Sequence, residues 1–541
     1  MNLSGNASKS ALAGAASGVL ALGVTELAHG LSSAVPSFVV SVAQQVARLT
    51  PGRVVTGAIE TLGTADVAFL IGATVLLTLA VCALLAHLSR SNPPGSLAGV
   101  LLLGAVGVLS ASSEPGSSFL AVALTAAVAL AAGSAAALLI LRSPRRDPGV
   151  RTDARELPVG RSRQTGEKGV SVGRRGFLAA SGLVVVAGLA LAGTGRLLGG
   201  TSSQQAPRPR RLKLPAGHPK KGAGGVLHET LPPPPKAASI EVKGMPKLIT
   251  PPGDFYLIDT ELSSPRLDAD TWKLSVKGAV DNPFEISYKE LLEMPTIEAD
   301  ITLCCVSNPV GGGLVSNGRW TGVLLSDILK EAGVSRDKIT RISEQLVGRS
   351  VDGFTTGFRT ALALDGRRAL VAFGLDGDQL PIKHGYPVRL VVPGLYGYVS
   401  ATKWLTEIEL TGWSYDAYWV RRTWSKQGPI KTQSRIDTVK DGQTLEAGTV
   451  PIGGVAWAPH RGISKVEVST DGGRSWHAAK LARSLSPDSW RQYVYYWNAT
   501  PGSHTLQVRA TDGTGKTQVA RETPPHPSGA TGYHTLHVSV A

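Results

Sequence analysis

Residues 301–320 read ITLCCVSNPVGGGLVSNGRW, an apolar run that ends at two adjacent cysteines and is followed by a glycine-rich stretch. The apolar residues over 299–306 predict a β-strand, in which Cys304 and Cys305 point to opposite faces and do not act as one chelate. A cysteine pair alone favours packing over chemistry, because free cysteine is among the most buried residue types. The stretch 308–320 predicts a long loop whose backbone can approach a bulky ligand or bind an anion.

A second block, residues 380–397 (LPIKHGYPVRLVVPGLYG), surrounds the apolar run 387–392, which predicts a buried strand. His384 precedes this run, Arg389 lies within it and Lys403 follows it. A buried unpaired charge is costly, so Arg389 requires an anionic partner. Two partners stay open at this point: a carboxylate in a structural ion pair, or the anionic group of a ligand.

The elements between residues 239 and 428 alternate between strands and short helices, which indicates an α+β domain. They are strands over 272–280, 299–306 and 387–392, and helices over 287–294 and 324–332. From residue 429 to residue 541 the pattern changes to short strands separated by Gly-containing turns. About seven strands in about 110 residues predict an immunoglobulin-like β-sandwich.

Residues 1–200 carry five apolar runs, and the longer ones can cross a hydrocarbon core of ~30 Å as helices. The runs cover residues 11–30, 66–88, 97–112, 118–141 and 177–198. Their Ala and Gly content allows close helix–helix approach. The first run is the weakest because it contains Glu26 and His29. We therefore predict a multi-domain protein that begins with transmembrane α-helices.

The loop over 142–175 holds ten basic residues against four acidic ones, which predicts a cytoplasmic position. Five crossings then place the chain after residue 200 outside the cytoplasm. The expected protein is a multi-pass protein of the cell membrane with an extracytoplasmic catalytic region. The stretch Arg174-Arg175-Gly176-Phe177-Leu178 resembles a twin-arginine export signal. Two ordinary anchoring arginines are the alternative, and cleavage after residue 190 stays open.

Composition limits the remaining classes. The chain has 541 residues and a net charge of +15, and this length indicates several domains. Its three cysteines are too few for a disulfide scaffold. The positive charge follows from membrane topology and from a Pro-, Gly- and Lys/Arg-rich tether over 201–238, so we expect no nucleic-acid partner. His29 and His87 fall at opposite ends of their predicted helices, and no haem is predicted.

These blocks resemble the sulfite oxidase family of molybdopterin enzymes. The family pattern Thr-Leu-x-Cys-x-x-Asn matches residues 302–308, and Trp-x-Gly-x-x-Leu matches residues 320–325. The family's Leu-Pro-x-x-His-Gly-x-Pro-x-Arg pattern matches residues 380–389, and its Lys-Trp pair matches residues 403–404. The region from residue 429 resembles the family's dimerisation domain. The resemblance extends over residues 240–541.

The resemblance implies a molybdenum–molybdopterin cofactor with Cys305 as its thiolate ligand and catalytic residue. Five positions would bind the pterin and its phosphate: Asn308, Gly312, His384, Arg389 and Lys403. The implied reaction is a two-electron oxygen-atom transfer on a small sulfur- or nitrogen-oxo substrate. The implied partners are that substrate, membrane lipid, an external electron carrier (a quinone or a cytochrome) and a second copy of the chain in a homodimer.

Two departures from the family pattern bear on the substrate. Pro309 stands where sulfite oxidases have an arginine, and Phe373 stands where a tyrosine is expected. The chain therefore lacks a guanidinium and a phenol that could bind a small tetrahedral dianion such as sulfite. We do not expect sulfite to be the physiological substrate. The alternatives are a sulfoxide or protein-repair reductase on the same fold, and a binding ectodomain without a cofactor.

Overall fold

The structure is a computed structural model that describes residues 3–32, 34–51, 54, 57–58, 65–142, 174–202, 220–221 and 227–541. Two compact units divide the chain, Met1–Arg208 and Pro209–Ala541. Most of the basic loop 142–175 and much of the tether 201–238 lie outside the described residues. The membrane orientation was predicted from the charges of that loop, so it stays a prediction.

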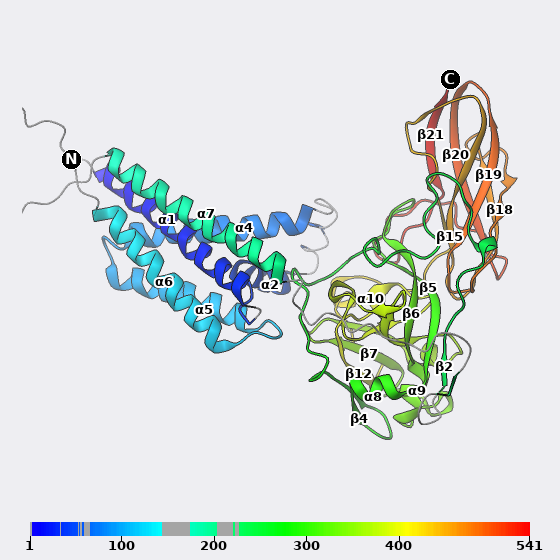
Figure 1. Ribbon diagram of the computed structural model, residues 1–541, viewed down its shortest axis with the longest axis horizontal. Helices are drawn as coiled ribbons and strands as arrows, with labels where there is room; N and C mark the ends of the chain where they lie inside the picture. The colour runs from blue at the N-terminus through cyan, green and yellow to red at the C-terminus, as the bar shows by residue number, and fades with distance from the viewer. Residues whose placement is uncertain are drawn as a thin grey trace, which may run out of the picture. The chain divides into compact units, whose positions relative to one another are not determined.

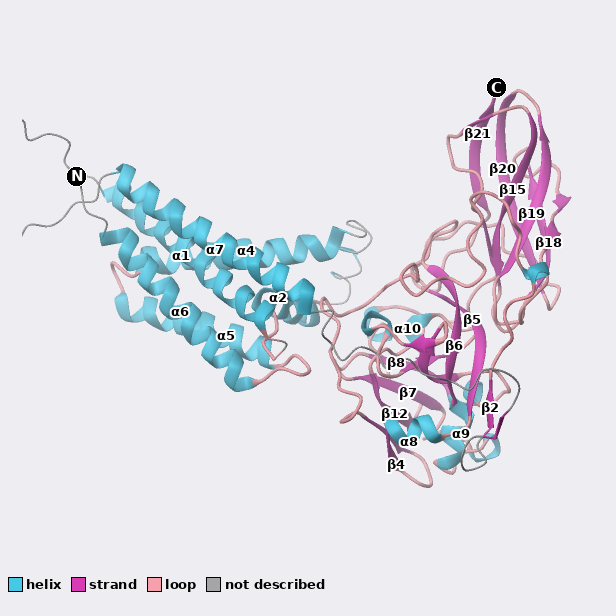
Figure 2. Ribbon diagram, viewed as in Figure 1, coloured by secondary structure: helices cyan, strands magenta, loops and turns pink. Residues whose placement is uncertain are grey.

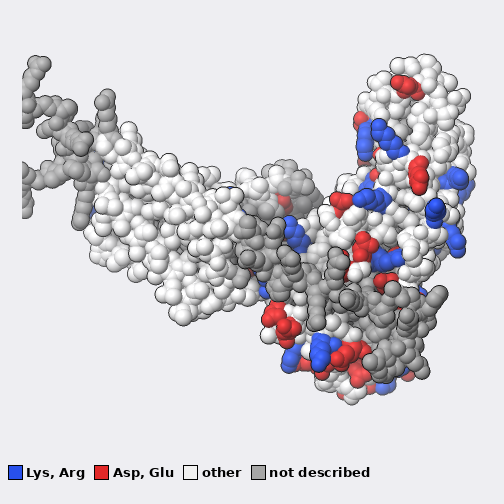
Figure 3. All heavy atoms as spheres, in the orientation of Figure 1, with Lys and Arg blue, Asp and Glu red and all other residues white. Residues whose placement is uncertain are grey.

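The first unit is a bundle of α-helices (Figures 1 and 2). The helices are α1 (Leu3–Leu31), α2 (Phe38–Leu49), α4 (Asp66–Leu88), α5 (Pro93–Ser112), α6 (Phe119–Arg142) and α7 (Arg174–Ser202). All of them except α2 are long and apolar enough to cross a membrane, which confirms the five predicted helices. The visible face of this unit is almost without charged side chains, whereas the second unit carries both signs (Figure 3).

Glycines join α1 to α7. A methyl group at Gly23 would lie 2.2 Å from the carbonyl oxygen of Gly188, and one at Gly30 would lie 2.1 Å from that of Gly195. Only residues without a Cβ allow the two backbones to come so close. Both contacts advance by seven residues along each helix, so α1 and α7 run parallel. If each of the five apolar helices crosses a membrane once, the first and the fifth run in the same direction. The parallel packing of α1 and α7 agrees with this.

The polar residues of α1 belong to its junction with α2. Ser37, at the N-terminus of α2, donates a hydrogen bond of 2.6 Å from Oγ to Oε1 of Glu26. His29 Nδ1 donates to the carbonyl oxygen of Val35 over 2.8 Å. Glu26 and His29 lower the hydropathy of the first apolar run, and their role is to hold the turn between α1 and α2.

Two β-sheets open the second unit. The larger has the order β1-β2-β5-β6-β9-β10 with β11 beside β9, and the smaller has the order β4-β3-β12-β7-β8. The strands of the larger sheet are β1 (Lys220–Lys221), β2 (Leu227–Glu229), β5 (Thr296–Cys304), β6 (Val315–Leu324), β9 (Leu370–Leu375), β10 (Asp378–Gln379) and β11 (Arg389–Val391). The smaller sheet holds β3 (Lys273–Gly278), β4 (Phe284–Ser287), β7 (Gln345–Ser350), β8 (Thr355–Arg359) and β12 (Leu405–Thr411). Short helices join them, namely α8 (Tyr288–Glu293), α9 (Leu325–Glu331) and α10 (Gly397–Ser400).

Strand β5 separates two cores. Ile301 and Leu303 face a core that includes Trp320, whereas Cys304 belongs to the core shared by the two sheets. This is the predicted alternation of a strand with both faces buried. Cys305 follows the last residue of β5 and leaves the sheet.

The glycine-rich loop is shorter than predicted. Residues 315–324 form β6, which pairs antiparallel with β5 from Cys304 opposite Val315 to Thr296 opposite Val323. The polar residues of β6 masked its strand character in the sequence, and pairing with β5 satisfies its backbone. The tether also joins this sheet at its end, because β2 pairs in parallel with the start of β5.

The C-terminal region consists of two further sheets. Their strands are β13 (Gln433–Ile436), β14 (Thr444–Leu445), β15 (Gly448–Trp457), β16 (Ile463–Ser469), β17 (His477–Ala478), β18 (Lys480–Leu481), β19 (Arg491–Ala499), β20 (Gly502–Asp512) and β21 (His534–Val540). Apolar residues of both sheets share one core, including Tyr493 from β19 and Leu506 from β20. The two-layer β arrangement is therefore present, and its immunoglobulin-like character stays a prediction.

Candidate active site

The loop after β5 holds Cys305 in a closed turn. The backbone N–H of Cys305 donates to the carbonyl oxygen of Leu314 over 3.0 Å, and the N–H of Asn308 donates to the carbonyl oxygen of Cys305 over 3.1 Å. The side chain of Asn308 closes the same turn, because its Oδ1 accepts a 2.8 Å hydrogen bond from the N–H of Leu314. The predicted role of Asn308 is thus joined to a structural one that fixes the cysteine.

The two cysteines have different surroundings. Burial raises the pKa of the Cys305 thiol, and the N–H and hydroxyl of Ser307 and the N–H of Val306 oppose this by donating toward the sulfur. Donors that point at a sulfur favour the thiolate, which is the form that binds metals. Burial also raises the pKa of Cys304, whose Sγ lies 3.4 Å from the carbonyl oxygen of Cys305. Only Cys305 lies outside the strand and among several donors.

Three predicted cofactor-binding residues meet around Gly385. Arg389 donates from one terminal nitrogen to the carbonyl oxygen of His384 over 3.0 Å, and Lys403 Nζ donates to that of Lys383 over 3.0 Å. A methyl group at Gly385 would lie 3.0 Å from Cβ of Lys403 and 3.2 Å from Cβ of Arg389. Gly385 has a φ of +105°, which favours glycine. The turn thus brings all three side chains into one cluster.

Arg389 is a buried cation without a carboxylate at ion-pair distance. Only 5% of it is exposed, and its guanidinium donates to the carbonyl oxygens of His384 and Leu390. None of the ion pairs within residues 227–541 involves it, since the nearby Asp259 pairs with Lys403. Burial lowers the pKa of Arg389 to about 10, which still leaves it charged at neutral pH. Of the two partners open in the sequence, the anionic group of a ligand fits this environment.

His384 and Lys403 complete the cluster with different charges. Burial, followed by the charges of Arg389 and Lys403, lowers the pKa of His384 to about 4, so its ring is neutral at neutral pH. Its Nε2–H donates to the carbonyl oxygen of Pro252 over 3.0 Å. Burial lowers the pKa of Lys403 to about 8, and Asp259 opposes that shift. The cluster therefore offers two cations and a neutral ring whose single N–H is already bonded to Pro252.

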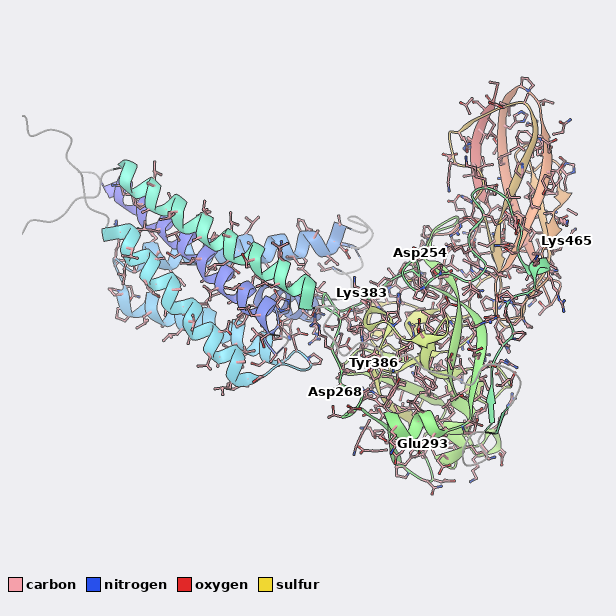
Figure 4. All side chains as sticks on the ribbon, in the orientation of Figure 1. Asp254, Asp268, Glu293, Lys383, Tyr386 and Lys465 are labelled. Atoms are coloured by element: carbon pink, nitrogen blue, oxygen red, sulfur yellow. The ribbon has the colours of Figure 1, made fainter. Side chains whose placement is uncertain are left out.

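A segment without any motif crosses this cluster, and we call residues 252–259 the strap. Its Pro252 contacts His384, its Asp259 pairs with Lys403, and the ring of Phe255 lies 5.6 Å from that of His384. Figure 4 labels Asp254 in the strap, and Lys383 and Tyr386 on either side of His384 and Gly385. Sequence reasoning missed the strap, and the aromatic pair at residues 255–256 in an irregular stretch is the only signal that it gives.

Gly312 faces the C-terminal region instead of the cation cluster. Its N–H donates to the carbonyl oxygen of Pro309 over 2.9 Å, and its carbonyl oxygen accepts from Arg435 over 2.7 Å. A cavity of about 300 Å³ lies on this side of the loop. It is lined by Gly311, Gly313, Arg435, Ile436, Asp437, Val439, Lys440, Asp441, His534 and Leu536.

These residues fit a molybdopterin group. A buried cation at Arg389 and a donor-rich thiol at Cys305 match the group's phosphate and its metal. Within the described part of the chain, no cluster of three His, Cys, Asp or Glu side chains could hold a metal ion. A metal at Cys305 would thus need its other ligands from the cofactor, which supplies the two-electron chemistry when bound.

Comparison with known families supports a molybdopterin enzyme over a binding ectodomain without a cofactor. Residues 261–419 match the oxidoreductase molybdopterin binding domain, and residues 426–522 match the Mo-co oxidoreductase dimerisation domain. Both matches fall within the second unit. The second unit is therefore of the molybdopterin oxidoreductase type, and the resemblance seen in its motifs is confirmed.

Individual known proteins are also similar to this chain. Human mitochondrial sulfite oxidase is 30% identical over 280 residues, 44% of this chain and 51% of that protein. The NADPH nitrate reductase of Mycosarcoma maydis is 28% identical over 330 residues, 49% of this chain and 33% of that protein. The solved sulfane dehydrogenase SoxCD from Paracoccus pantotrophus has a TM-score of 0.47 and 23% identity, over 56% of this chain and 83% of that chain. The chain spans about half the length of the human sulfite oxidase that it matches.

Proposed function

We propose that this protein is a membrane-anchored molybdenum oxidoreductase that transfers an oxygen atom to or from a small sulfur- or nitrogen-oxo compound. The observation that carries the proposal is the buried cation of Arg389, which has no carboxylate at ion-pair distance and lies in a matched molybdopterin-binding domain. A cofactor-free binding ectodomain has no use for a buried cation of this kind.

The reaction balances with an external electron carrier. In the oxidative direction, the substrate gains one oxygen atom from water and releases two electrons and two protons. The electrons pass to an acceptor of the quinone or cytochrome class, and the reductive direction is the reverse. Cys305 would hold the metal, and Arg389, His384 and Lys403 would hold the pterin and its phosphate.

We further propose that sulfite is not the substrate, because two positions that carry an arginine and a tyrosine in the family pattern lack them here. Pro309 is exposed on the loop and brings neither charge nor donor, and Phe373 is fully buried in β9. A dianion needs cations or several donors at its oxygens, whereas a sulfoxide or N-oxide needs fewer. We therefore place uncharged oxo compounds ahead of sulfite.

Metal analysis and a substrate panel test the proposal. The full chain, purified in detergent from a host that makes the cofactor, should hold about one molybdenum and one pterin per chain. The panel contains sulfite, dimethyl sulfoxide, methionine sulfoxide and trimethylamine N-oxide, each with a dye as electron donor or acceptor. Protein that matures in such a host without molybdenum would refute the proposal.

The same proposal includes an uncleaved membrane anchor. The helix α7 packs on α1 through Gly188 and Gly195, so it fits a permanent part of the bundle better than a removable signal. Intact mass measurement of the membrane-bound protein should give the full chain, and a product that starts after residue 190 would contradict retention.

We also propose that the catalytic region lies outside the cytoplasm. Support comes from the five apolar helices and from the positive charge of residues 142–175. Protease added to intact spheroplasts should remove residues 230–541 and spare the helices. Replacing Arg174 and Arg175 with lysine should block delivery of the holoenzyme if the twin-arginine signal operates, whereas normal delivery would leave the arginines a topological role alone.

The C-terminal region supports a homodimer, because it matches a dimerisation domain. Light scattering of the purified full chain, corrected for detergent, should give twice the mass of one chain.

A further inference from the structure

The C-terminal region reaches the loop that follows Cys305 through Arg435. The Nη1 of Arg435 donates to the carbonyl oxygen of Gly312 over 2.7 Å, and its Nε donates to Oδ1 of Asp437, also over 2.7 Å. Both side chains of this ion pair are largely buried. The guanidinium therefore has a carboxylate on one side, which balances its charge, and a peptide oxygen of the loop on the other.

The backbone of Arg435 is itself firmly held. It lies in β13 opposite Val455 of β15, and its carbonyl oxygen accepts a 2.9 Å hydrogen bond from the hydroxyl of Tyr493. Tyr493 is fully buried in the core of the C-terminal sheets. A guanidinium that is fixed at its backbone and paired at Nε loses little freedom when it binds a further acceptor. Its charge-assisted hydrogen bond to the loop is therefore a strong one.

The loop over 309–313 has few supports of its own. Three successive glycines bring no side chains to it, and Gly311 has a φ of +73°. The cavity of about 300 Å³ borders Gly311 and Gly313, so this side of the loop is not closely packed. The ring of His534 limits it at one point, since a methyl group on Gly311 would lie 2.2 Å from Cδ2. Because glycine has the most backbone freedom of all residues, a fixed conformation here needs hydrogen bonds from outside the loop.

Gly312 is joined to Cys305 through one turn. A methyl group on Gly312 would lie 2.5 Å from Oδ1 of Asn308, and that oxygen accepts from the N–H of Leu314. The carbonyl oxygen of Leu314 in turn accepts from the N–H of Cys305 over 3.0 Å. A displacement of the Gly312 peptide therefore reaches Cys305 through Asn308 and Leu314.

We propose that Arg435 is a positioning residue for Cys305, which it orients from the C-terminal region through Gly312. This rests on the proposed function, because Cys305 needs a fixed direction as a metal ligand. The region that matches a dimerisation domain thus also supports the metal site. Groups that hold a metal ligand in place typically change metal affinity or activity by about tenfold to a hundredfold when they are removed.

The test separates the hydrogen bond to Gly312 from the ion pair. Asp437→Asn removes the ion pair and keeps the guanidinium. The double variant Arg435→Gln, Asp437→Asn removes both, leaves no unpaired charge, and has a side chain too short to reach Gly312. Arg509→Gln is the matched control, because Arg509 donates to Glu467 over 3.0 Å between β20 and β16 of the same region.

Hydrogen exchange of the full chain, made in a host without the cofactor, measures the loop itself. The amides of Cys305, Asn308 and Leu314 should exchange about tenfold to a hundredfold faster in the double variant, because a hydrogen bond to a charged group is lost. They should exchange as in the wild type in Asp437→Asn and Arg509→Gln.

The holoenzyme gives a second readout at the metal. The double variant should shift the thiolate absorption band and the g-values of the Mo(V) electron paramagnetic resonance signal. It should lower kcat about tenfold with KM unchanged. Its thermal midpoint should differ from that of the wild type no more than that of Arg509→Gln does, so the effect is local.

The outcomes separate the inference from the proposed function. Equal loop exchange in the double variant and the wild type overturns the inference, and so does equally fast exchange in Asp437→Asn, which would assign the effect to the ion pair. Faster exchange with unchanged absorption and resonance signals also overturns it, because Arg435 would then hold the loop without orienting Cys305. A wild type without molybdenum refutes the proposed function, whereas the exchange result still shows whether Arg435 fixes the loop.

Discussion

The guanidinium carbon of Arg389 lies 5.0 Å from the centre of the Trp320 ring. Trp320 comes from β6, is fully buried, and donates from Nε1 to the carbonyl oxygen of Ile301 over 3.2 Å. A cation over an aromatic face is stabilised by the ring, and more so where water is excluded. One side chain therefore links the strand that leads to Cys305 with the turn that carries the cluster of His384, Arg389 and Lys403.

Arg389→Lys should reduce the molybdenum content of purified protein about tenfold or more, because an ammonium group cannot form the planar fork or stack on the ring. Metal analysis of the full chain measures this. Arg368→Lys is the matched control, since Arg368 is a half-exposed arginine that pairs with Glu229 at 3.2 Å. Equal molybdenum in both variants would show that Arg389 does not hold the cofactor.

Cys305→Ser should abolish oxidoreductase activity and the thiolate absorption of the holoenzyme, with little change in thermal midpoint. Cys304→Ser should keep both readouts and cost about 1 kcal/mol in the free energy of unfolding, because a serine there can donate to the carbonyl oxygen of Cys305. Visible absorption and dye-linked turnover measure the two variants side by side. The reverse ranking would move the metal ligand to Cys304.

Gly188→Ala should lower the thermal midpoint of the bundle in detergent, because the added methyl would lie 2.6 Å from the carbonyl oxygen of Val19. Overpacking of this kind costs about 1–3 kcal/mol. Gly182→Ala on the same helix is the control, since a methyl there meets nothing within 4 Å. If both variants melt alike, the tight packing of α1 on α7 is not what stabilises the bundle.

The free energy of unfolding should fall as the pH drops from about 6.5 to about 4, in part through His534. Burial, followed by Arg435, lowers the pKa of His534 from 6.5 to about 4. In that window the unfolded chain binds a proton that the folded chain does not, so acid favours unfolding. His534→Asn keeps an acceptor for the N–H of Ile436, which now bonds to Nδ1 over 3.0 Å, and removes the titration. Its pH profile, measured by chemical denaturation in detergent, should be flatter than that of the wild type.

Sequence patterns predict best where a short local signal decides the structure. The helix predicted over 66–88 has the same bounds in the structure, because an uncharged run between polar ends has one stable conformation in a membrane. The helix α2 was missed because 12 residues that include Ser41 and Gln44 give no such run. The strand β6 was missed because its Ser, Asn and Gly residues resemble a loop until β5 lies beside them.

The candidate site divides in the same way. The motifs and the family resemblance predict Cys305, Arg389 and their neighbours as site residues, because a thiolate ligand and a phosphate-binding cation each restrict the residue type. The strap has no such restriction. Asp259 of the strap and Lys403 are separated by more than 140 residues of sequence and meet only through tertiary packing. A pattern within one segment cannot show which distant segment will cover it.

The parallel contact of α1 with α7 also sets an order of assembly. The glycine face of α1, at Gly23 and Gly30, has its partner on α7, the last helix of the bundle in chain order. Until α7 has been made, these glycines lack the backbone that packs against them. The first unit therefore cannot reach its final packing before its whole length has been synthesised.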